Sequence, residues 1–164
     1  MDAWAEHTFL FADIVGFTAF TERVGDDAAA DVAVAFKSAA GHAADMPGCE
    51  VVKDLGDGVM IHGRDAVSVV MLALRLAHEL TGEGWCPPVR MGLHSGTAVQ
   101  RDGDWYGSTV NVAARLAASA GPGEVLMSVE TRDRLATGAG LTIADRGPRR
   151  FRDVAAPLAV YAAA

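Results

Sequence analysis

The sequence has few cysteines, few lysines and no long hydrophobic run, and each shortage argues against a class of protein. Only two of its 164 residues are cysteines, Cys49 and Cys86. They form neither a disulfide framework nor a metal-binding spacing, so we expect a reducing, cytoplasmic location. No apolar run reaches the ~18 residues of a membrane helix, and Asp2 and Glu6 do not follow the basic-then-apolar order of a signal peptide. We therefore expect no membrane segment in this chain.

Positive charge is also scarce, which limits what the protein can bind. The formal net charge is −7, and this argues against a general nucleic-acid surface. A ligand that carries phosphates would therefore need cations of its own. Two of the fourteen basic residues are lysines, Lys37 and Lys53, so Lys53 stands out as a candidate for a specific contact.

Apolar residues are abundant, and their pattern bears on domain organisation. The chain is 51% hydrophobic and 21% charged, which is typical of a globular domain large enough to bury a core. No repeat, low-complexity run or linker interrupts it. We predict a single domain over residues 1–164.

Hydrophobic periodicity and turn signals predict both helices and strands. The expected helices cover residues 18–24, a segment opened at 26–27 and ended by 46–48, and residues 65–80, 109–120 and 129–135. The expected strands are 8–13, a hairpin over 49–62 that turns at 56–58, an alternating strand over 89–94, strands 124–128 and 141–144, and a basic hairpin over 146–161, with a polar turn at 100–104. This order suits an α+β fold, a ferredoxin-like α/β sandwich with a mostly antiparallel sheet, helices on one face and a small C-terminal β addition.

Two aspartates lie where strands of this predicted sheet end. Asp13 closes a buried apolar strand, where an unpaired carboxylate is costly, so it either caps the next segment or holds a cation. Asp57 lies in an Asp-Gly turn and could simply supply turn geometry. If the first strand lies beside the hairpin, the two carboxylates converge. Such a pair beside a glycine turn suits Mg²⁺ with a polyphosphate.

Two further polar residues share one side of a predicted helix. Asn111 and Arg115 are four residues apart, so they can act on one ligand, although a solvated helix face explains them equally well. His94 has no second histidine at metal-binding spacing, and a structural role is the simpler interpretation.

Four motifs, in order along nearly the whole chain, resemble the catalytic domain of class III nucleotide cyclases, the adenylate and guanylate cyclases. The chain resembles bacterial members, which have a short loop before the helix with the Asn/Arg pair. The motifs are FADIVGFT at residues 11–18, VKDLGD at 52–57, VRMGLHSG at 89–96 and GSTVNVAAR at 107–115.

The resemblance implies a role for each matching residue. Two Mg²⁺ or Mn²⁺ ions per active site are implied, bound by Asp13, Asp57 and the carbonyl of Ile14. The resemblance also implies that the backbone of Gly16, Phe17 and Thr18 binds the terminal phosphates, and that Arg90 and Arg152 contact the triphosphate. It implies that Lys53 and Asp104 recognise the purine. Asn111 is then expected to orient the ribose, and Arg115 to stabilise charge at the attacked phosphorus. Asp102 is the alternative to Asp104, and Arg149 and Arg150 are the alternatives to Arg152. Trp105-Tyr106 departs from the family, where an aliphatic residue and a tryptophan are more usual.

Together these residues predict an adenylate cyclase that converts ATP to 3′,5′-cyclic AMP and pyrophosphate by in-line attack of the ribose 3′-hydroxyl on the α-phosphate. A lysine can only donate and an aspartate can only accept, which matches adenine and opposes guanine. The resemblance also implies a homodimer with active sites at its interface. The alternatives are a guanylate cyclase, where glutamate is expected at Lys53, a catalytically silent nucleotide-binding or regulatory module, and a plain structural α+β domain.

Overall fold

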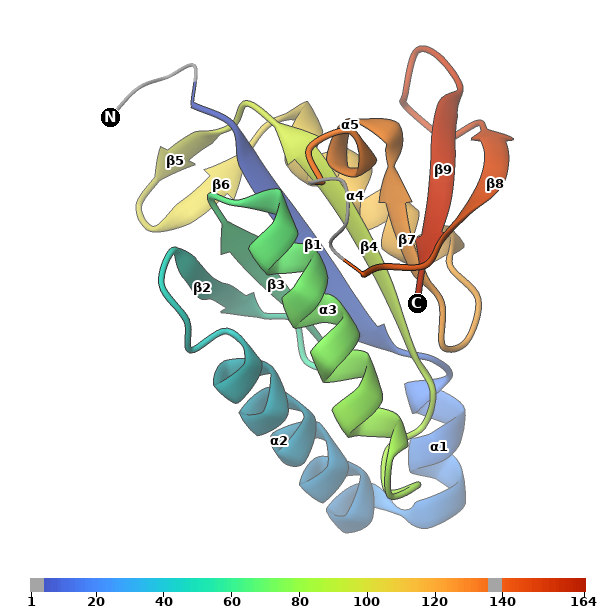
Figure 1. The fold of residues 1–164 in the computed structure, drawn as a ribbon. Coiled ribbons are helices and arrows are strands. Elements are labelled where there is room, and N and C mark those ends of the chain that lie inside the picture. The colour runs from blue at the N-terminus through green and yellow to red at the C-terminus, as the bar shows by residue number, and fades with distance from the viewer. Residues whose placement is uncertain (1–4, 136–139) are drawn as a thin grey trace.

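The computed structural model describes residues 5–135 and 140–164, so Asp2 lies outside the described residues. Figure 1 shows a sheet with helices in front of it and behind it. The helices are α1 (Phe17–Val24), α2 (Asp26–Ala43), α3 (Ala66–Thr81), α4 (Ser108–Ser119) and α5 (Val129–Arg132). The strands are β1 (His7–Ile14), β2 (Cys49–Asp54), β3 (Gly58–Gly63), β4 (Val89–Gly96), β5 (Val99–Arg101), β6 (Asp104–Tyr106), β7 (Val125–Ser128), β8 (Ile143–Arg149) and β9 (Leu158–Ala163).

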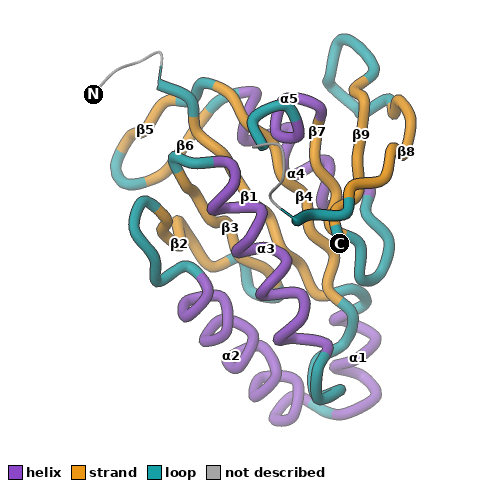
Figure 2. Tube along the Cα trace, viewed as in Figure 1, coloured by secondary structure: helices purple, strands orange, loops and turns teal. Residues whose placement is uncertain are grey.

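The main sheet has β1 near its centre, and this position determines what surrounds Asp13. In the described part of the chain the strand order is β2-β3-β1-β4-β7-β9-β8, and the tube in Figure 2 follows the same path. β1 pairs antiparallel with both β3 and β4, whereas β4 and β7 are parallel. The prediction of a mostly antiparallel α/β sandwich is confirmed.

Helices cover both faces of the sheet, so the expectation of helices on one face is wrong for α4. Leu10, Ala12 and Ile14 of β1 pack in one core with side chains of α2 and α3. The alternate residue Phe9 packs on the other side, with Val110 and Ala113 of α4. A central strand that is apolar on both faces needs a cover on both, and the alternating polar pattern expected for a one-sided sheet does not apply to β1.

Gly92 of β4 allows α4 to approach very closely. A Cβ added there would lie 2.1 Å from the backbone nitrogen of Ala117 and 2.8 Å from the carbonyl oxygen of Ala113. No side chain fits in that space, so the helix backbone lies directly against the strand. This contact fixes where α4 presents its outward-facing residues.

Several predicted segments differ from the structure in extent. Residues 100–104, expected as a polar turn, belong to a hairpin in which β5 and β6 form a separate two-stranded sheet. The strand expected at 141–144 is β8, which runs to Arg149, and it pairs with β9 in the hairpin that was expected to begin at residue 146. The helix expected over 129–135 ends at Arg132. Strands of three residues carry too little periodicity to be recognised in the sequence.

None of the described helices combines the length and the apolar character needed to cross a bilayer.

Candidate active site

The turn between β2 and β3 lies beside the end of β1 and brings Asp57 next to Asp13. The backbone N–H of Ile14 donates to the carbonyl of Asp57 at 2.9 Å, and Asp13 is paired with Gly58 across the strands. Asp54 shapes this turn, because its carboxylate accepts from the N–H of Gly56 at 2.7 Å and pairs with Lys37 at 2.7 Å. The backbones of the two aspartates therefore lie side by side at this end of the sheet, and Asp54 is a contributor that sequence reasoning missed.

The two carboxylates differ in their surroundings. Asp13 accepts two hydrogen bonds on Oδ2, from Nε of Arg90 at 3.1 Å and from Nη2 at 2.9 Å. Among residues 5–135 and 140–164, no hydrogen bond or ion pair involves the carboxylate of Asp57. Gly58 lies tight against β1 beside this pair, since an added Cβ would lie 2.8 Å from the carbonyl oxygen of Ala12 and 3.6 Å from Oδ1 of Asp13.

This arrangement fits a divalent cation that takes part of its coordination from a ligand. In the part of the chain that the structure describes, no three side chains of histidine, cysteine, aspartate or glutamate gather as a protein-only metal cage. Mg²⁺ usually binds one or two carboxylates and completes its shell with phosphate and water oxygens. Asp13 and Asp57 match that donor set, and Ile14, whose side chain has no ligand atom, could contribute only its backbone carbonyl.

The chain turns directly from β1 into the start of α1. Gly16 has φ of 65°, a left-handed conformation that suits glycine, and Phe17 is the first helical residue. No side chain caps this helix start. Its N–H groups are therefore available to an anion, as the first N–H groups of a helix commonly are.

Arg90 reaches from β4 across the same end of the sheet. Besides Asp13, it donates from Nη1 to the carbonyl of Ala118 in α4 at 3.0 Å. The structure therefore places this predicted triphosphate residue in the metal half of the site, where its side chain links the end of β1 to α4.

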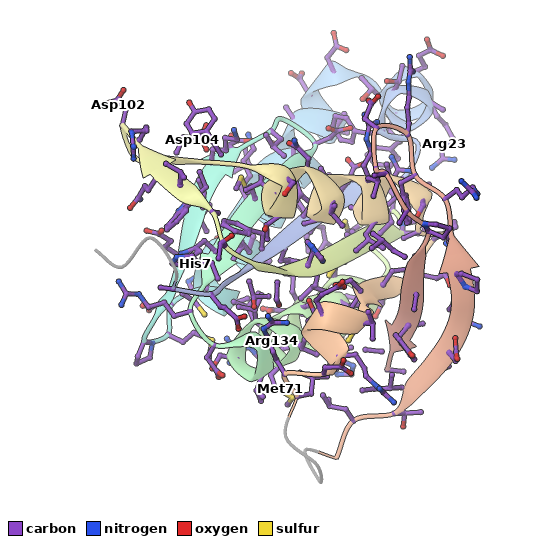
Figure 3. All side chains as sticks on the ribbon, turned by 90° about the horizontal axis from the view of Figure 1, so that it is seen from above. His7, Arg23, Met71, Asp102, Asp104 and Arg134 are labelled. Atoms are coloured by element: carbon purple, nitrogen blue, oxygen red, sulfur yellow. The ribbon has the colours of Figure 1, made fainter. Side chains whose placement is uncertain are left out.

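Lys53 and Asp104, 51 positions apart in the sequence, form an ion pair. Nζ of Lys53 lies 2.8 Å from Oδ2 of Asp104, and both side chains remain partly exposed. This lysine lowers the pKa of Asp104 below its usual value, helped by the N–H of Trp105. Asp102 lies at the tip of the hairpin (Figure 3). Geometry therefore favours Asp104 over Asp102 as the partner of Lys53.

An irregularity in β2 turns Lys53 toward the face of the sheet that α4 covers. Val51 is opposite Ile61, but Lys53 is opposite Met60, with Val52 as the extra residue between them. Met60 packs in the core on the α4 side, and residues directly opposite each other share a face. In regular pairing Lys53 would be opposite Val59 and face α3, so the bulge is what aims it at Asp104.

Asn111, Arg115 and Arg152 line one cavity of about 670 Å³ between α4 and the β8–β9 connection. Arg115 also pairs with Asp153 at 3.2 Å, a partner that sequence reasoning missed although it follows Arg152 directly. Arg149 instead donates to the carbonyl of Ser119 at 3.3 Å. The cavity therefore groups Arg152, rather than Arg149, with the Asn/Arg pair.

A family model of the adenylate and guanylate cyclase catalytic domain matches residues 1–156. A pH-sensitive adenylate cyclase of Mycobacterium tuberculosis is 36% identical over 152 residues, which are 90% of this chain and 38% of that protein. The chain thus spans well under half the length of this curated relative.

Two solved structures share this fold, one of an adenylate cyclase and one of a guanylate cyclase domain. A Trypanosoma brucei adenylate cyclase in its monomeric state has a TM-score of 0.91 at 23% identity, covering 99% of this chain and 89% of that one. The guanylate cyclase domain of RhGC from Catenaria anguillulae, in complex with GTP, has a TM-score of 0.85 at 20% identity, covering 100% and 98%. The fold therefore does not separate ATP from GTP, and the site residues must do so.

Proposed function

Because the chain belongs to the family of adenylate and guanylate cyclase catalytic domains, we propose that it is an adenylate cyclase that converts ATP to 3′,5′-cyclic AMP and pyrophosphate. The observation that carries the choice of adenine is the pairing of Lys53 with Asp104 at 2.8 Å. The ammonium group donates to a ring nitrogen of adenine, and the carboxylate accepts from its exocyclic amine. Guanine presents a ring N–H and a carbonyl instead, so both contacts would be wrong.

The end of β1 is the proposed phosphate and metal half of the site. Asp13 and Asp57, with the carbonyl of Ile14, would hold two Mg²⁺ or Mn²⁺ ions. When bound, such ions supply charge that favours the attacking and the leaving oxygen of an in-line displacement. The N–H groups at Gly16, Phe17 and Thr18 bind the terminal phosphates at the start of α1.

Arg90 pairs with Asp13, one of the two proposed metal ligands. Its guanidinium bonds Asp13 at 2.9 Å, so it lies where a triphosphate would meet the carboxylates. With Asp13 engaged as a metal ligand, the guanidinium of Arg90 would donate to phosphate oxygens, which arginine binds well.

The α4 cavity is the proposed ribose half of the site. Asn111 orients the ribose, so that the 3′-hydroxyl oxygen attacks the α-phosphorus as the bond to the pyrophosphate oxygen breaks and the hydroxyl proton passes to solvent water. Arg115 stabilises the charge that develops on the phosphoryl oxygens, and Arg152 binds the triphosphate. Positioning and charge stabilisation dominate because the chemistry needs no covalent intermediate on the protein.

A homodimer accounts for the arrangement of these two halves. Asp13 and Lys53 both face the α4 side of the sheet, yet no hydrogen bond or ion pair of the described residues joins the Asp13–Asp57 group to Lys53, Asp104, Asn111 or Arg115. Each chain carries one complete set of both groups. A second copy related by a two-fold axis would supply the missing half to each of two equivalent sites.

The proposed location is the cytoplasm, where ATP is abundant and thiols remain reduced. Both cysteines are free, and burial raises the pKa of Cys86 to about 11. A thiol with a raised pKa is a poor nucleophile and is inert toward disulfide exchange.

The test is to incubate the purified protein with ATP or GTP and with Mg²⁺ or Mn²⁺, and to identify the product by mass spectrometry. Cyclic AMP from ATP is the expected result. A Lys53→Glu variant should lose ATP turnover by on the order of 10²-fold, because one donor contact is replaced by a repulsive acceptor. If the unaltered protein prefers GTP, the purine assignment is wrong and a guanylate cyclase remains. If neither nucleotide is cyclised, a silent nucleotide-binding module remains.

A further inference from the structure

One buried side chain anchors the hairpin that carries Asp104 to the core of the molecule. β5 and β6 pair with each other and form no strand pairing with the main sheet. Of residues 99–106, all of which the structure describes, only Trp105 is buried, with 5% of its surface exposed. The position of Asp104 therefore depends on how Trp105 is held.

The indole ring of Trp105 packs among three other rings. It stacks on His62 with ring centroids 4.3 Å apart and an interplanar angle of 25°, and it meets the edge of Phe9 at 5.6 Å. His7 lies 4.5 Å away. These rings come from β1 and β3 of the main sheet, so the hairpin is fixed to the most central part of the fold.

Polar contacts fix the rotation of the same ring. Nε1–H of Trp105 donates to Oε1 of Glu50 at 3.4 Å, and this oxygen also lies 3.2 Å from Nδ1 of His62. Nδ1 of His7 lies 2.8 Å from Nε2 of His62. One set of tautomers satisfies every contact: His62 donates to Glu50 through Nδ1–H and accepts at Nε2 from Nδ1–H of His7. One pattern of protonation therefore satisfies every contact that joins these three rings and Glu50.

The backbone of Trp105 passes this rigidity to the carboxylate of Asp104. The N–H of Trp105 donates to Oδ1 of Asp104 at 2.8 Å, and Nζ of Lys53 binds Oδ2 at 2.8 Å. One oxygen is held by the anchored hairpin and the other by the bulged strand β2. The carboxylate of Asp104 is thus held on both of its oxygens, by the backbone of the anchored hairpin and by the side chain of Lys53.

From these contacts we infer that Trp105, held by His62 and Glu50, is a positioning residue that sets Asp104 at the distance from Lys53 that adenine requires. The inference rests on the proposed function, because it assigns Trp105 to base selection at the same site. Asp104 makes the contact with the base, and Trp105 acts through it. Loss of the ring leaves Asp104 on a mobile hairpin, where it no longer favours adenine or rejects guanine.

The first test compares Trp105→Ala, Trp105→Phe and Tyr106→Ala by steady-state rates with ATP and with GTP. Trp105→Ala should raise KM for ATP and lower the preference for ATP over GTP about tenfold, which is the loss of one well-placed hydrogen bond, while kcat changes little. Trp105→Phe keeps the stacking on His62 and should restore most of the preference. Tyr106→Ala is the matched control, because Tyr106 is the neighbouring aromatic residue and is 55% exposed.

A double-mutant cycle distinguishes positioning from a general loss of structure. In an Asp104→Ala background, Trp105→Ala should cause no further change in base preference, because both act through one contact. An equal loss in both backgrounds would overturn the inference. Should Trp105→Ala fail to fold, Glu50→Ala carries the same test: Glu50 is half-exposed, and its loss frees the ring without removing it. Unchanged preference in folded Glu50→Ala, with normal thermal unfolding, would equally overturn it.

A binding measurement separates this inference from the proposed function. ATP carrying an N-methylanthraniloyl group on the ribose is bound to the protein and displaced with unlabelled ATP or GTP, which reports base preference without turnover. If the unaltered protein forms no cyclic nucleotide but prefers ATP, and Trp105→Ala loses that preference, the proposed activity fails and the inference stands. If the unaltered protein and Trp105→Ala both form cyclic AMP and prefer ATP over GTP equally, the proposed activity stands and the inference is overturned. A protein that binds neither nucleotide overturns both.

Discussion

Asp13 and Asp57 are neighbours, but their carboxylates differ in their contacts with the rest of the chain. Asp13 is bound by the guanidinium of Arg90 and is part of a contact that links β1, β4 and α4. The carboxylate of Asp57 has no hydrogen-bond or ion-pair partner in the described segments. A substitution at Asp57 therefore tests chemistry with little effect on folding, whereas one at Asp13 leaves a partly buried arginine without its counter-ion.

Asp57→Asn should lower kcat roughly 10³-fold with Mg²⁺, because charge stabilisation by a bound cation contributes several kcal/mol to the transition state. Its thermal unfolding midpoint should stay within about 2 °C of that of the unaltered protein, since no described contact is lost. Cyclase assays and circular dichroism on the same samples check both statements. Near-normal activity in Asp57→Asn would show that the metal assignment is wrong.

The buried histidines predict how stability depends on pH. Burial lowers the pKa of His62 to about 4, with His7 and Arg64 acting in the same direction and Glu50 opposing them, and burial also lowers the pKa of His7. The unfolded chain takes up protons near pH 6.5 and the native protein only at lower pH. The contribution of these neutral histidines to the free energy of unfolding is therefore fully present above pH 6.5, and it is lost as the pH drops toward about 4.

Urea unfolding between pH 7 and pH 4.5 measures this effect. His62→Gln should remove roughly 1–3 kcal/mol of the pH-dependent loss, because a glutamine binds no proton in either state. His78→Gln is the control, since His78 is exposed on α3. An identical pH slope in His62→Gln and the unaltered protein would show that His62 does not remain neutral through its burial.

At the scale of elements, two irregular features bring together Lys53 and Asp104, the proposed base-reading pair. The bulge at Val52 turns Lys53 to the α4 face, and the β5–β6 hairpin carries Asp104 to meet it. The close contact between Gly92 and Ala117 then sets the height of α4 above the sheet. Asn111 and Arg115 extend from this helix, so their position depends on a glycine in a neighbouring strand.

Gly92→Ala should destabilise the protein by about 1–3 kcal/mol, because the new methyl group would overlap the backbone of α4 and push the helix outward. The same substitution at Gly41 is a matched control, since this α2 glycine has open space around an added Cβ. Gly41→Ala should stabilise by about 0.5–1 kcal/mol through helix propensity. Denaturant unfolding of both variants checks the opposite signs, and two equal stabilities would contradict the packing described for Gly92.

At the scale of the whole molecule, the two proposed groups of site residues lie on one face of the sheet, with no hydrogen bond or ion pair between them among the described residues. The sheet presents Asp13 and Arg90 near the end of β1, and α4 presents Asn111 and Arg115 around the cavity shared with Arg152. That the whole chain is a single domain remains a prediction. A second chain is the proposed means by which the two groups meet.

Complementation of two inactive variants tests this proposal. Asp13→Ala and Arg115→Ala should each be inactive as homodimers, while a mixture should recover up to about a quarter of normal activity, since one of the two sites in each mixed dimer is intact and half of the dimers are mixed. Subunit exchange is verified by a tag on one variant. If exchange is complete and activity stays absent, each site is built within one chain. Mixing Asp13→Ala with Asp57→Ala is the negative control, because both variants lose the same half of the site.

The sequence by itself determined the family, the strand that ends at Asp13, the hairpin that turns at Asp57 and the helix that carries Asn111 and Arg115. These features depend on local periodicity and turn residues, which can be recognised from residues close together in the sequence. Only the tertiary structure decided that α4 covers the second face of the sheet, that Lys53 is turned by a bulge, and that Trp105 is buried among His7, Phe9 and His62. The physical reason is that each of these depends on partners distant in sequence, where a one-residue shift of pairing reverses the face of a side chain.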